Sequence, residues 1–317
     1  MEGIGPYALA WRRLRRNRTA LAFGAVFVIV VLMCLLAPVY AHDIAHTTPS
    51  ANHLTDKVDG KDVVSVAGIP IGPTWHGRFF LGADSNGRDV AVRLLYGGRN
   101  SLFIAGVATL ITMILAIVIG VSAGYFRGAV DGVLSRGLDL VWAYPVVILG
   151  VALGTTLAVG GLNFGPFHLK GNSLMVPAVI IGVIYVPYVA KPLRGQVLTL
   201  REREFVDAAR TLGLSSLKIM LSEIAPNVVS TLIVFIPLIV ANAILTEAGL
   251  SYLGAGVQDP NPSWGTMISD GIRLIPSAIH LTIVPGLMLV ACVIGLNIFG
   301  DGVRDALDPR ARVRIEH

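Results

Sequence analysis

The sequence predicts an all-α integral membrane protein with six transmembrane helices, and three observations support this fold class. Of its 317 residues, 54% are hydrophobic and only 14% are charged, which lies outside the range of ordinary soluble domains. Several apolar runs reach or approach the roughly 20 residues needed to cross a bilayer. Most of the 25 Lys and Arg residues fall in segments that a six-helix layout places on one side of the membrane, so the net charge of +5 reflects topology.

The N-terminal segment combines a basic cluster with the first apolar run. Five arginines occur between Trp11 and Arg18, and positive charge beside a hydrophobic segment is retained in the cytoplasm. Residues 1–18 are therefore predicted to be cytoplasmic, with the first transmembrane helix at 19–40. The run has no small-residue cleavage site, so no cleavable signal peptide is expected. The cluster lacks interleaved aromatic residues, so no nucleic-acid partner is predicted.

A long polar stretch follows at 41–99, and the topology places it outside the cytoplasm. His42, His46 and His53 could approach one another around a metal ion. Their spacing matches no closed metal site, and we favour solvated loop histidines.

The end of this stretch carries the string L-G-A-D-S-N-G-R-D-V at 81–90. Asn86-Gly87 is a turn signal, and the string lacks the acidic positions that a calcium loop requires. Residues 89–99 are predicted to form an amphipathic segment that lies along the outer surface.

The remaining apolar runs predict five further transmembrane helices in a core at 100–300. We expect these helices at 101–125, 140–159, 173–189, 228–248 and 278–299. The connections are expected to be a charged cytoplasmic loop at 127–139, outer segments at 160–172 and 249–277, and a cytoplasmic tail at 301–317. Prolines within these runs, such as Pro145, are commonly tolerated because neighbouring helices satisfy the freed carbonyl groups.

The sequence offers little that could carry out chemistry. Neither a G-x-x-x-x-G-K-[ST] phosphate loop nor an H-E-x-x-H zinc motif occurs. Cys34 and Cys292 lie inside apolar runs, which argues against a disulfide framework or a zinc site. We therefore expect no catalytic residue, no metal site and no cofactor bound by this chain.

Residues 201–226 form the longest charged segment between apolar runs, and they are patterned. Phe205, Ala208, Ala209 and Leu212 recur at the spacing of one helix face. Gly213 follows, and glycine is favoured at a helix C-terminus because it takes a left-handed conformation without strain.

A second short helix is predicted directly after this glycine. Ser215 or Ser216 can cap it, and its Leu217, Met220, Leu221 and Ile224 share one face up to Pro226. The segment is thus predicted to be two amphipathic helices joined at a glycine elbow and held against the membrane. The periodicity alone favours an ordinary interfacial hairpin.

The spacing of D-A-A at 207–209, Gly213 and Pro226 resembles the cytoplasmic EAA loop of bacterial ABC importer permeases. In that family the first helix of the loop docks into a groove of the ATPase subunit and transmits its motion. Asp207 stands where the family usually has Glu, which keeps the charge and shortens its reach. The resemblance implies an ATPase-coupling role for Glu204, Phe205, Asp207, Ala208, Ala209, Arg210, Leu212 and Gly213.

The segment 243–265 also resembles the peptide-permease pattern. Its Glu247 is the one carboxylate within an apolar run, and an ionisable group at membrane depth is a functional hypothesis by default. The alternative is structural, with the carboxylate bridging the glycine-rich turn that follows. Together with Gln258 and Trp264, Glu247 is predicted to belong to an outer gate or substrate pathway.

Taken from the basic N-terminus to the closing G-D-G-V-R-D-A-L-D-P-R at 300–310, the chain resembles the C-type permease subunit of dipeptide/oligopeptide ABC importers. The resemblance implies a type I permease core in the bacterial cytoplasmic membrane, surrounded by lipid, with both termini cytoplasmic. It also implies a second, B-type permease, two ATPase subunits that bind ATP and Mg, and an extracytoplasmic substrate-binding protein. Transport would follow alternating access.

Alternatives within and outside this family remain open. The same subfamily handles nickel, glutathione and other small solutes. An ion-coupled secondary carrier would be expected to carry buried carboxylates or histidines at mid-membrane, where only Glu247 qualifies. A membrane enzyme would need clustered catalytic residues near one interface, which the sequence does not suggest.

Overall fold

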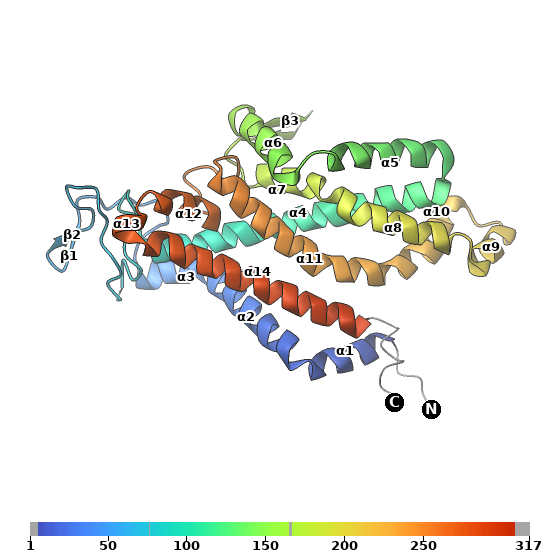
Figure 1. Ribbon diagram of the computed structural model, residues 1–317, viewed down its shortest axis with the longest axis horizontal. Helices are drawn as coiled ribbons and strands as arrows, with labels where there is room; N and C mark the ends of the chain where they lie inside the picture. The colour runs from blue at the N-terminus through green and yellow to red at the C-terminus, as the bar shows by residue number, and fades with distance from the viewer. Residues whose placement is uncertain (1–5, 76, 165–166, 308–317) are drawn as a thin grey trace.

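Helices dominate the computed structural model, which describes residues 6–75, 77–164 and 167–307 (Figure 1). Among these residues, five spans are long and apolar enough to cross a membrane. They are α2 (Arg18–Leu35), α4 (Val90–Phe126), α7 with α8 (Met175–Ile184 and Val186–Leu200), the Thr231–Tyr252 part of α11 (Ala225–Tyr252) and α14 (His280–Leu307). A sixth results if α5 (Gly128–Trp142) and α6 (Val146–Gly160), bent by 87° at their break, count as one. The prediction of an all-helical, six-span membrane protein is confirmed in this sense.

The N-terminal helix α1 (Pro6–Arg16) packs on the far end of α14. Its Ala10 and Leu14 form a small cluster with Ala306. Asn17 separates it from α2, and its Oδ1 accepts a hydrogen bond of 3.0 Å from the Ala20 N–H, as an N-cap does. The predicted span at 19–40 ends as α2 at Leu35, and the short turns α3 (Ala37–Val39) and η1 (Tyr40–Ile44) follow.

The central helix α4 starts eleven residues earlier than predicted, at Val90 and not at 101. Asp89 caps it, with Oδ1 accepting from the Val92 N–H at 2.9 Å. The prediction that residues 89–99 lie along the outer surface is wrong, because Val92 and Arg93 are 0% and 1% exposed. This first part of α4 packs against α12 (Trp264–Ile272), so its amphipathic pattern marks a buried helix end.

Small residues let neighbouring helices approach α4 closely. A Cβ at Gly120 would lie 2.8 Å from the Ala190 carbonyl oxygen, and one at Gly124 would lie 2.7 Å from Val197. The G-V-S-A-G at 120–124 also has the spacing of a hydrolase nucleophile elbow. It lies inside a continuous helix, where it serves packing against α8, and an elbow would require a strand-to-helix turn.

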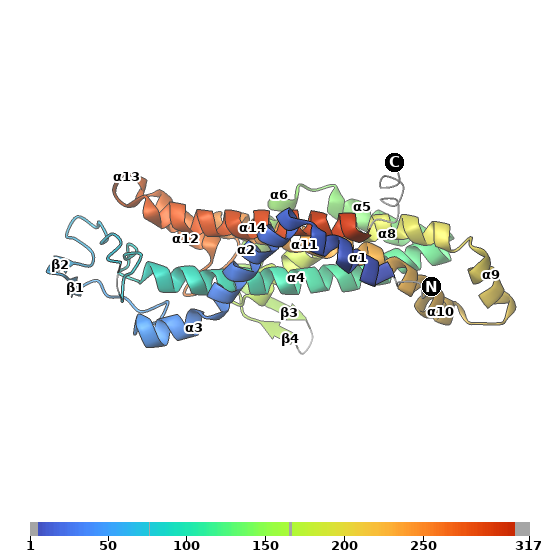
Figure 2. The same cartoon turned by 90° about the horizontal axis from the view of Figure 1, so that it is seen from below.

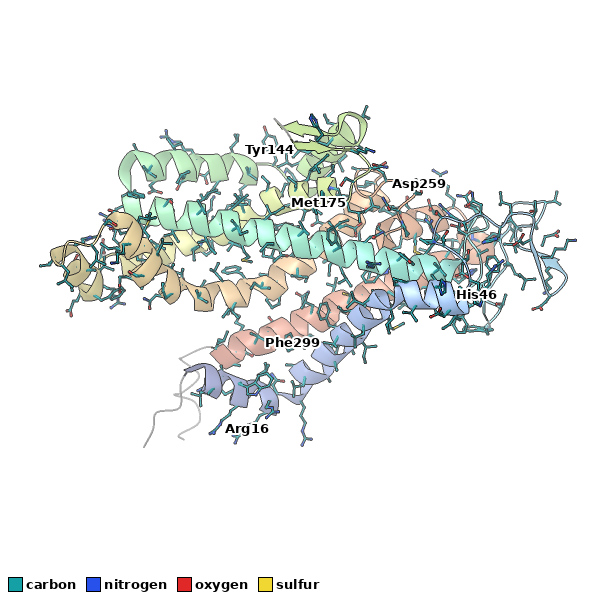
Figure 3. All side chains as sticks on the ribbon, turned by 180° about the vertical axis from the view of Figure 1, so that it is seen from behind. Arg16, His46, Tyr144, Met175, Asp259 and Phe299 are labelled. Atoms are coloured by element: carbon teal, nitrogen blue, oxygen red, sulfur yellow. The ribbon has the colours of Figure 1, made fainter. Side chains whose placement is uncertain are left out.

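The third predicted span is broken, and the loop predicted at 127–139 is the helix α5. Asp131 and Asp139 gave this segment a loop-like charge pattern, but both pair with basic residues of α8. The break lies at Ala143 and Tyr144, directly before Pro145. Proline disfavours helical geometry in the residue before it and lacks an N–H. Figure 3 shows Tyr144 at this bend.

The fourth span also runs further than predicted. It was expected to end near 189, before Lys191 and Arg194, but α8 continues to Leu200. Pairing with α5 accounts for both charges. The hairpin of β3 (Leu162–Phe164) and β4 (Phe167–Leu169) connects α6 to α7.

The predicted elbow at 201–226 is present as α9 (Glu204–Thr211) and α10 (Ser216–Ile219). The second helix does not stop at Pro226, because α10 continues through η2 (Met220–Ile224) directly into α11. Pro226 is the second residue of α11 and directly follows the π-helical turn η2, so it lies where the regular α-helical hydrogen-bond pattern is interrupted.

The long axis of the molecule runs between two ends of different character. The α9–α10 elbow lies at one end, called the α9 end below, and the polar stretch with β1 (Lys57–Val58) and β2 (Lys61–Asp62) lies at the other, the loop end (Figures 1 and 2). α12 and α13 (Ile275–Ala278) lie at the loop end too. Most of the segment predicted at 249–277 is therefore ordered by α12 and α13.

Candidate functional site

The glycine elbow has the local geometry that its sequence predicts. Gly213 has φ of +78°, a value that costs glycine little. Its N–H donates to the Arg210 carbonyl at 2.9 Å, and the Leu214 N–H donates to the Ala209 carbonyl at 3.1 Å, so the end of α9 is closed. Ser215 then starts α10 by accepting from the Lys218 N–H at 3.4 Å.

The buried face of α9 differs from the predicted one. Val206 and Ala209 are buried, whereas Phe205, Ala208 and Leu212 are exposed, Leu212 to 80%. Of the four residues predicted to form one apolar face of α9, only Ala209 is therefore packed against the helix bundle. The pattern identified the helix, but the contact with the rest of the fold decided which edge turns inward.

The second helix shows the same division. Ile219, Met220 and Ile224 are buried, whereas Leu217 and Leu221 are exposed to 63% and 64%. Four large apolar side chains thus face outward at this end of the molecule, which we call the coupling face. They are Phe205, Leu212, Leu217 and Leu221.

Two arginines fasten the elbow to α4 through Tyr125. Arg201 donates a hydrogen bond to the Tyr125 carbonyl, and its guanidinium lies 5.6 Å from the centre of the Tyr125 ring. The Arg210 guanidinium lies 5.8 Å from the same centre, within the range of cation–π attraction. Arg210 also pairs with Asp207 at 3.0 Å, so this predicted coupling residue faces the bundle as well as the surface.

A further ion pair joins the same region. Arg127, at the turn between α4 and α5, pairs with Glu202, which lies just before α9. The hydrogen bond and charge of Arg127 lower the pKa of the Glu202 carboxyl. The sequence analysis did not identify the contacts of Tyr125, Arg127, Arg201 and Glu202. The only sequence feature that indicates them is the clustering of charged residues after α4 and before α9. Glu204 is exposed in the first turn of α9, where the helix dipole favours a carboxylate.

At the loop end, Glu247 is fully buried. Its Oε1 accepts a hydrogen bond of 2.6 Å from the Ser251 hydroxyl, which in turn accepts from the Val257 N–H at 2.9 Å. Its Oε2 is buried and has no hydrogen-bond partner among the described residues. Glu247 therefore bridges the turn after α11, which is the geometry expected of the structural alternative.

The other two predicted gate residues are also held by local contacts. Trp264 is fully buried, and its indole N–H donates to the Leu94 carbonyl at 3.1 Å, which ties α12 to α4. Gln258 donates to the carbonyls of Gly254 and Gly256, each at 3.1 Å, and so closes its own loop. A pathway role for these three residues stays a prediction.

A charge cluster at the loop end was missed by sequence reasoning; Asp84, Arg88 and Arg93 are buried in it, and Asp270 is half exposed. Arg88 contacts Asp84 at 2.7 Å and Asp270 at 3.6 Å, and Arg93 contacts the same two carboxylates at 3.4 and 3.9 Å. We call these four residues the loop-end cluster. Arg93 also donates to the Pro49 carbonyl at 3.1 Å, so the cluster joins the polar stretch, α4 and α12. In the sequence, the only feature that indicates this cluster is the four-residue spacing of Asp84 and Arg88 within residues 81–90.

The histidines of the polar stretch do not gather. His53 contacts Asp56 at 3.0 Å and Thr47 at 2.8 Å, and His42 contacts Asp43 at 2.5 Å. Within the described residues, no group of three or more His, Cys, Asp or Glu side chains has an arrangement that could hold a metal ion.

The family model that describes the binding-protein-dependent transport system inner membrane component matches residues 116–313, which cover more than half of the chain. The chain belongs to this permease family. A second model, the N-terminal transmembrane domain of oligopeptide transport permease C, matches residues 5–55 and places the permease in the C-type group.

Curated relatives resemble the permease over almost their whole length. A dipeptide transport system permease protein of Alkalihalophilus pseudofirmus is 31% identical over 98% of this chain and 91% of its own. An oligopeptide transport system permease protein of Escherichia coli is 33% identical over 98% and 94%. A glutathione transport system permease protein of Pectobacterium atrosepticum is 29% identical over 97% and 92%.

A solved structure shares the fold of the permease. A chain from the methionine ABC transporter MetNI in an inward-facing conformation superposes with a TM-score of 0.53 at 18% identity. The superposition covers 67% of this chain and 95% of that one. The type I importer core predicted for residues 100–300 is thus present as a fold.

Proposed function

We propose that this permease is the C-type membrane subunit of an ATP-driven importer that takes up dipeptides and oligopeptides by alternating access. The observation that carries the proposal is the coupling face: four large apolar side chains face outward on a helix pair that Arg201 and Arg210 fasten to α4. Exposed apolar side chains on rigid helices fit a groove in a partner protein. A carrier that works without a partner protein does not require an exposed apolar surface of this kind at the α9 end.

The partner at this face would be an ABC ATPase. Phe205 and Leu212 would enter its groove, with Ala208 between them leaving room for close approach of the backbone. Glu204 and Asp207 are exposed beside them and can pair with basic residues at the rim of the groove. The hydrogen bonds that close α9 at Gly213 hold the two helices at a fixed angle, so that movement of the ATPase would displace the whole elbow.

The remaining assembly follows the same scheme. A second, B-type permease would complete the pore, two ATPase subunits would bind and hydrolyse ATP with Mg, and a substrate-binding protein would dock at the loop end. This chain would bind no cofactor and carry out no catalysis. The α9 end and both termini would lie in the cytoplasm, which agrees with the arginines of α1 beside the first span, and the membrane would be the bacterial inner membrane.

Peptides are the preferred substrate class because relatives over the full chain are named for dipeptide and oligopeptide transport. Nickel, glutathione or another small solute is the second candidate within the subfamily, favoured by the relative named for glutathione transport. An ion-coupled carrier has less support, because the buried Glu247 is engaged by Ser251 at the turn after α11.

The test is reconstitution of this chain with its B-type permease, its ATPase subunits and its binding protein in liposomes. We expect uptake of labelled peptides that requires ATP and the binding protein and persists after ion gradients are collapsed. Uptake of nickel or glutathione but not peptides would favour the second candidate. Uptake driven by an ion gradient without the ATPase subunits would contradict the proposal.

A further inference from the structure

The helix α4 is longer than its neighbours, and unlike α8, α11 and α14 it contains no proline. It runs for 37 residues without a break, and none of them is proline. Pro192, Pro237 and Pro285 lie inside α8, α11 and α14, and the α5–α6 pair is bent by 87° before Pro145. Since proline is the commonest cause of kinks, α4 is the longest described helix that lacks this cause of bending.

One end of α4 is held by the elbow. Tyr125 is 6% exposed and precedes the last residue of the helix. Its carbonyl accepts from Arg201, and its ring lies under the guanidinium groups of Arg201 and Arg210. Arg210 belongs to α9 itself, so a displacement of α9 acts on Tyr125 directly.

The other end of α4 is held by the loop-end cluster. Arg93 lies in the first turn of the helix and is 1% exposed. Its partners Asp84 and Asp270 lie on the polar stretch and on α12, at 3.4 and 3.9 Å. The Arg93–Asp84 pair is almost fully shielded from water, so its interaction energy depends strongly on separation, whereas Asp270 is half exposed. A small shift of α4 therefore changes the contact between three segments at this end.

We propose that α4 acts as one rod, which carries displacement of the α9 elbow from Tyr125 to Arg93 and so sets the state of the loop-end cluster. Tyr125 and Arg93 are positioning residues in this scheme, because both act through the helix that joins them. The inference rests on the proposed function, since it takes the coupling face as the place where ATPase motion enters. It adds the route by which that motion reaches the opposite side of the membrane.

The first test interrupts the rod at a position that touches neither end. Gly106 lies near the middle of α4, is exposed, and a Cβ there would meet no described atom within 4 Å. Gly106→Pro removes a backbone N–H and kinks the helix, whereas Gly106→Ala is the matched control. The measurement is ATP hydrolysis by the reconstituted complex with and without saturating binding protein.

If α4 acts as one rod, the Gly106→Pro complex should hydrolyse ATP at the wild-type rate in the absence of binding protein. The stimulation of ATP hydrolysis by binding protein should fall roughly tenfold, which is within the range found for residues that carry coupling. Gly106→Ala should match the wild type. A Gly106→Pro complex that assembles and is stimulated like the wild type overturns the inference.

The second test changes Tyr125, which Arg201 and Arg210 hold at the α9 end of α4. This test remains decisive for the inference if the Gly106→Pro complex fails to assemble. Tyr125→Phe keeps the ring under both arginines, whereas Tyr125→Leu keeps an apolar side chain and loses the ring face. We expect stimulation by binding protein to fall in Tyr125→Leu and to be retained in Tyr125→Phe. Equal stimulation in both variants would overturn the role of Tyr125.

The outcomes also separate this inference from the proposed function. If the wild-type complex shows no ATP-dependent uptake of peptides or other solutes, the proposed function fails before any variant is compared. If the wild type transports and Gly106→Pro transports equally well, the importer stands and only the rod is wrong.

Discussion

Arg194 of α8 and Asp131 of α5 form a two-pronged ion pair, with Nε to Oδ1 at 2.5 Å and Nη2 to Oδ2 at 2.6 Å. The Arg194 and Asp131 side chains are 32% and 17% exposed. Ser135 donates to the same carboxylate at 2.8 Å. The planar fork of arginine matches a carboxylate in a way that lysine cannot. This pair fixes α5 along α8, where a loop had been predicted.

The first prediction concerns this pair. Arg194→Lys should lower the free energy of unfolding by about 1 kcal/mol, because one point charge replaces two parallel bonds at a partly exposed site. The measurement is thermal unfolding of the purified chain in detergent. In a double-mutant cycle, Arg194→Met and Asp131→Asn should be less damaging together than the sum of the two alone. Strict additivity would mean that the pair contributes nothing.

What the sequence could predict follows from how local each signal is. The Gly213 turn needs only its own neighbours and was predicted correctly, and of the two serines predicted as possible caps, Ser215 is the one that caps α10. Which edge of α9 is buried depends on the contact of Arg210 with Tyr125, a residue far away in the chain, and periodicity holds no information about that. The spans follow from hydropathy, but the start of α4 was missed because residues 89–99 look amphipathic. The sequence does not show that Asp84 and Asp270 lie beside Arg93.

The second prediction tests the coupling face. Leu212 is 80% exposed, so Leu212→Gln should leave the isolated chain as stable as the wild type. Loss of one apolar anchor from an interface costs more than about 1 kcal/mol when the residue is a hot spot, so the amount of ATPase that co-purifies should fall roughly tenfold.

The control for this prediction lies at the opposite end of the molecule. Val66 is fully exposed in the polar stretch, and Val66→Gln should leave co-purification of the ATPase unchanged. A bulky residue at the exposed Ala208, such as Ala208→Trp, should act like Leu212→Gln by blocking close approach. Full recovery of ATPase with both α9 variants would remove the support for a docking surface here.

The third prediction concerns the angle of the elbow. Gly213→Ala places a Cβ at φ of +78°, where no described atom lies within 4 Å of it. The change should therefore cost only the roughly 1 kcal/mol of a left-handed alanine. Gly213→Pro cannot reach this φ and also deletes the N–H that donates to Arg210. We expect Gly213→Pro to abolish ATP-driven uptake with normal membrane insertion, and Gly213→Ala to retain most of it. Uptake at the wild-type rate by Gly213→Pro would show that the fixed angle is dispensable.

The fourth prediction uses the cap of α4. Asp89 is fully buried, and its two carboxylate oxygens accept from the Phe79 N–H at 2.6 Å and the Val92 N–H at 2.9 Å. An amide has only one acceptor oxygen, so Asp89→Asn turns its NH₂ toward one of these donors. Leaving that buried N–H without a partner should destabilise the chain by about 1–3 kcal/mol.

The pH dependence of this difference gives a second readout. Burial raises the pKa of Asp89 above its ordinary value of 3.8, so over the range between the two values the folded state binds the proton more readily than the unfolded state. The contribution of Asp89 to stability therefore decreases as the pH rises through that range and levels off above the raised pKa. The stability advantage of the wild type over Asp89→Asn should be largest at acidic pH and smaller at neutral pH, as measured by thermal unfolding at several pH values. An advantage that grows toward neutral pH would mean that the backbone N–H bonds outweigh burial, and that the pKa of this carboxyl is lowered in the folded chain.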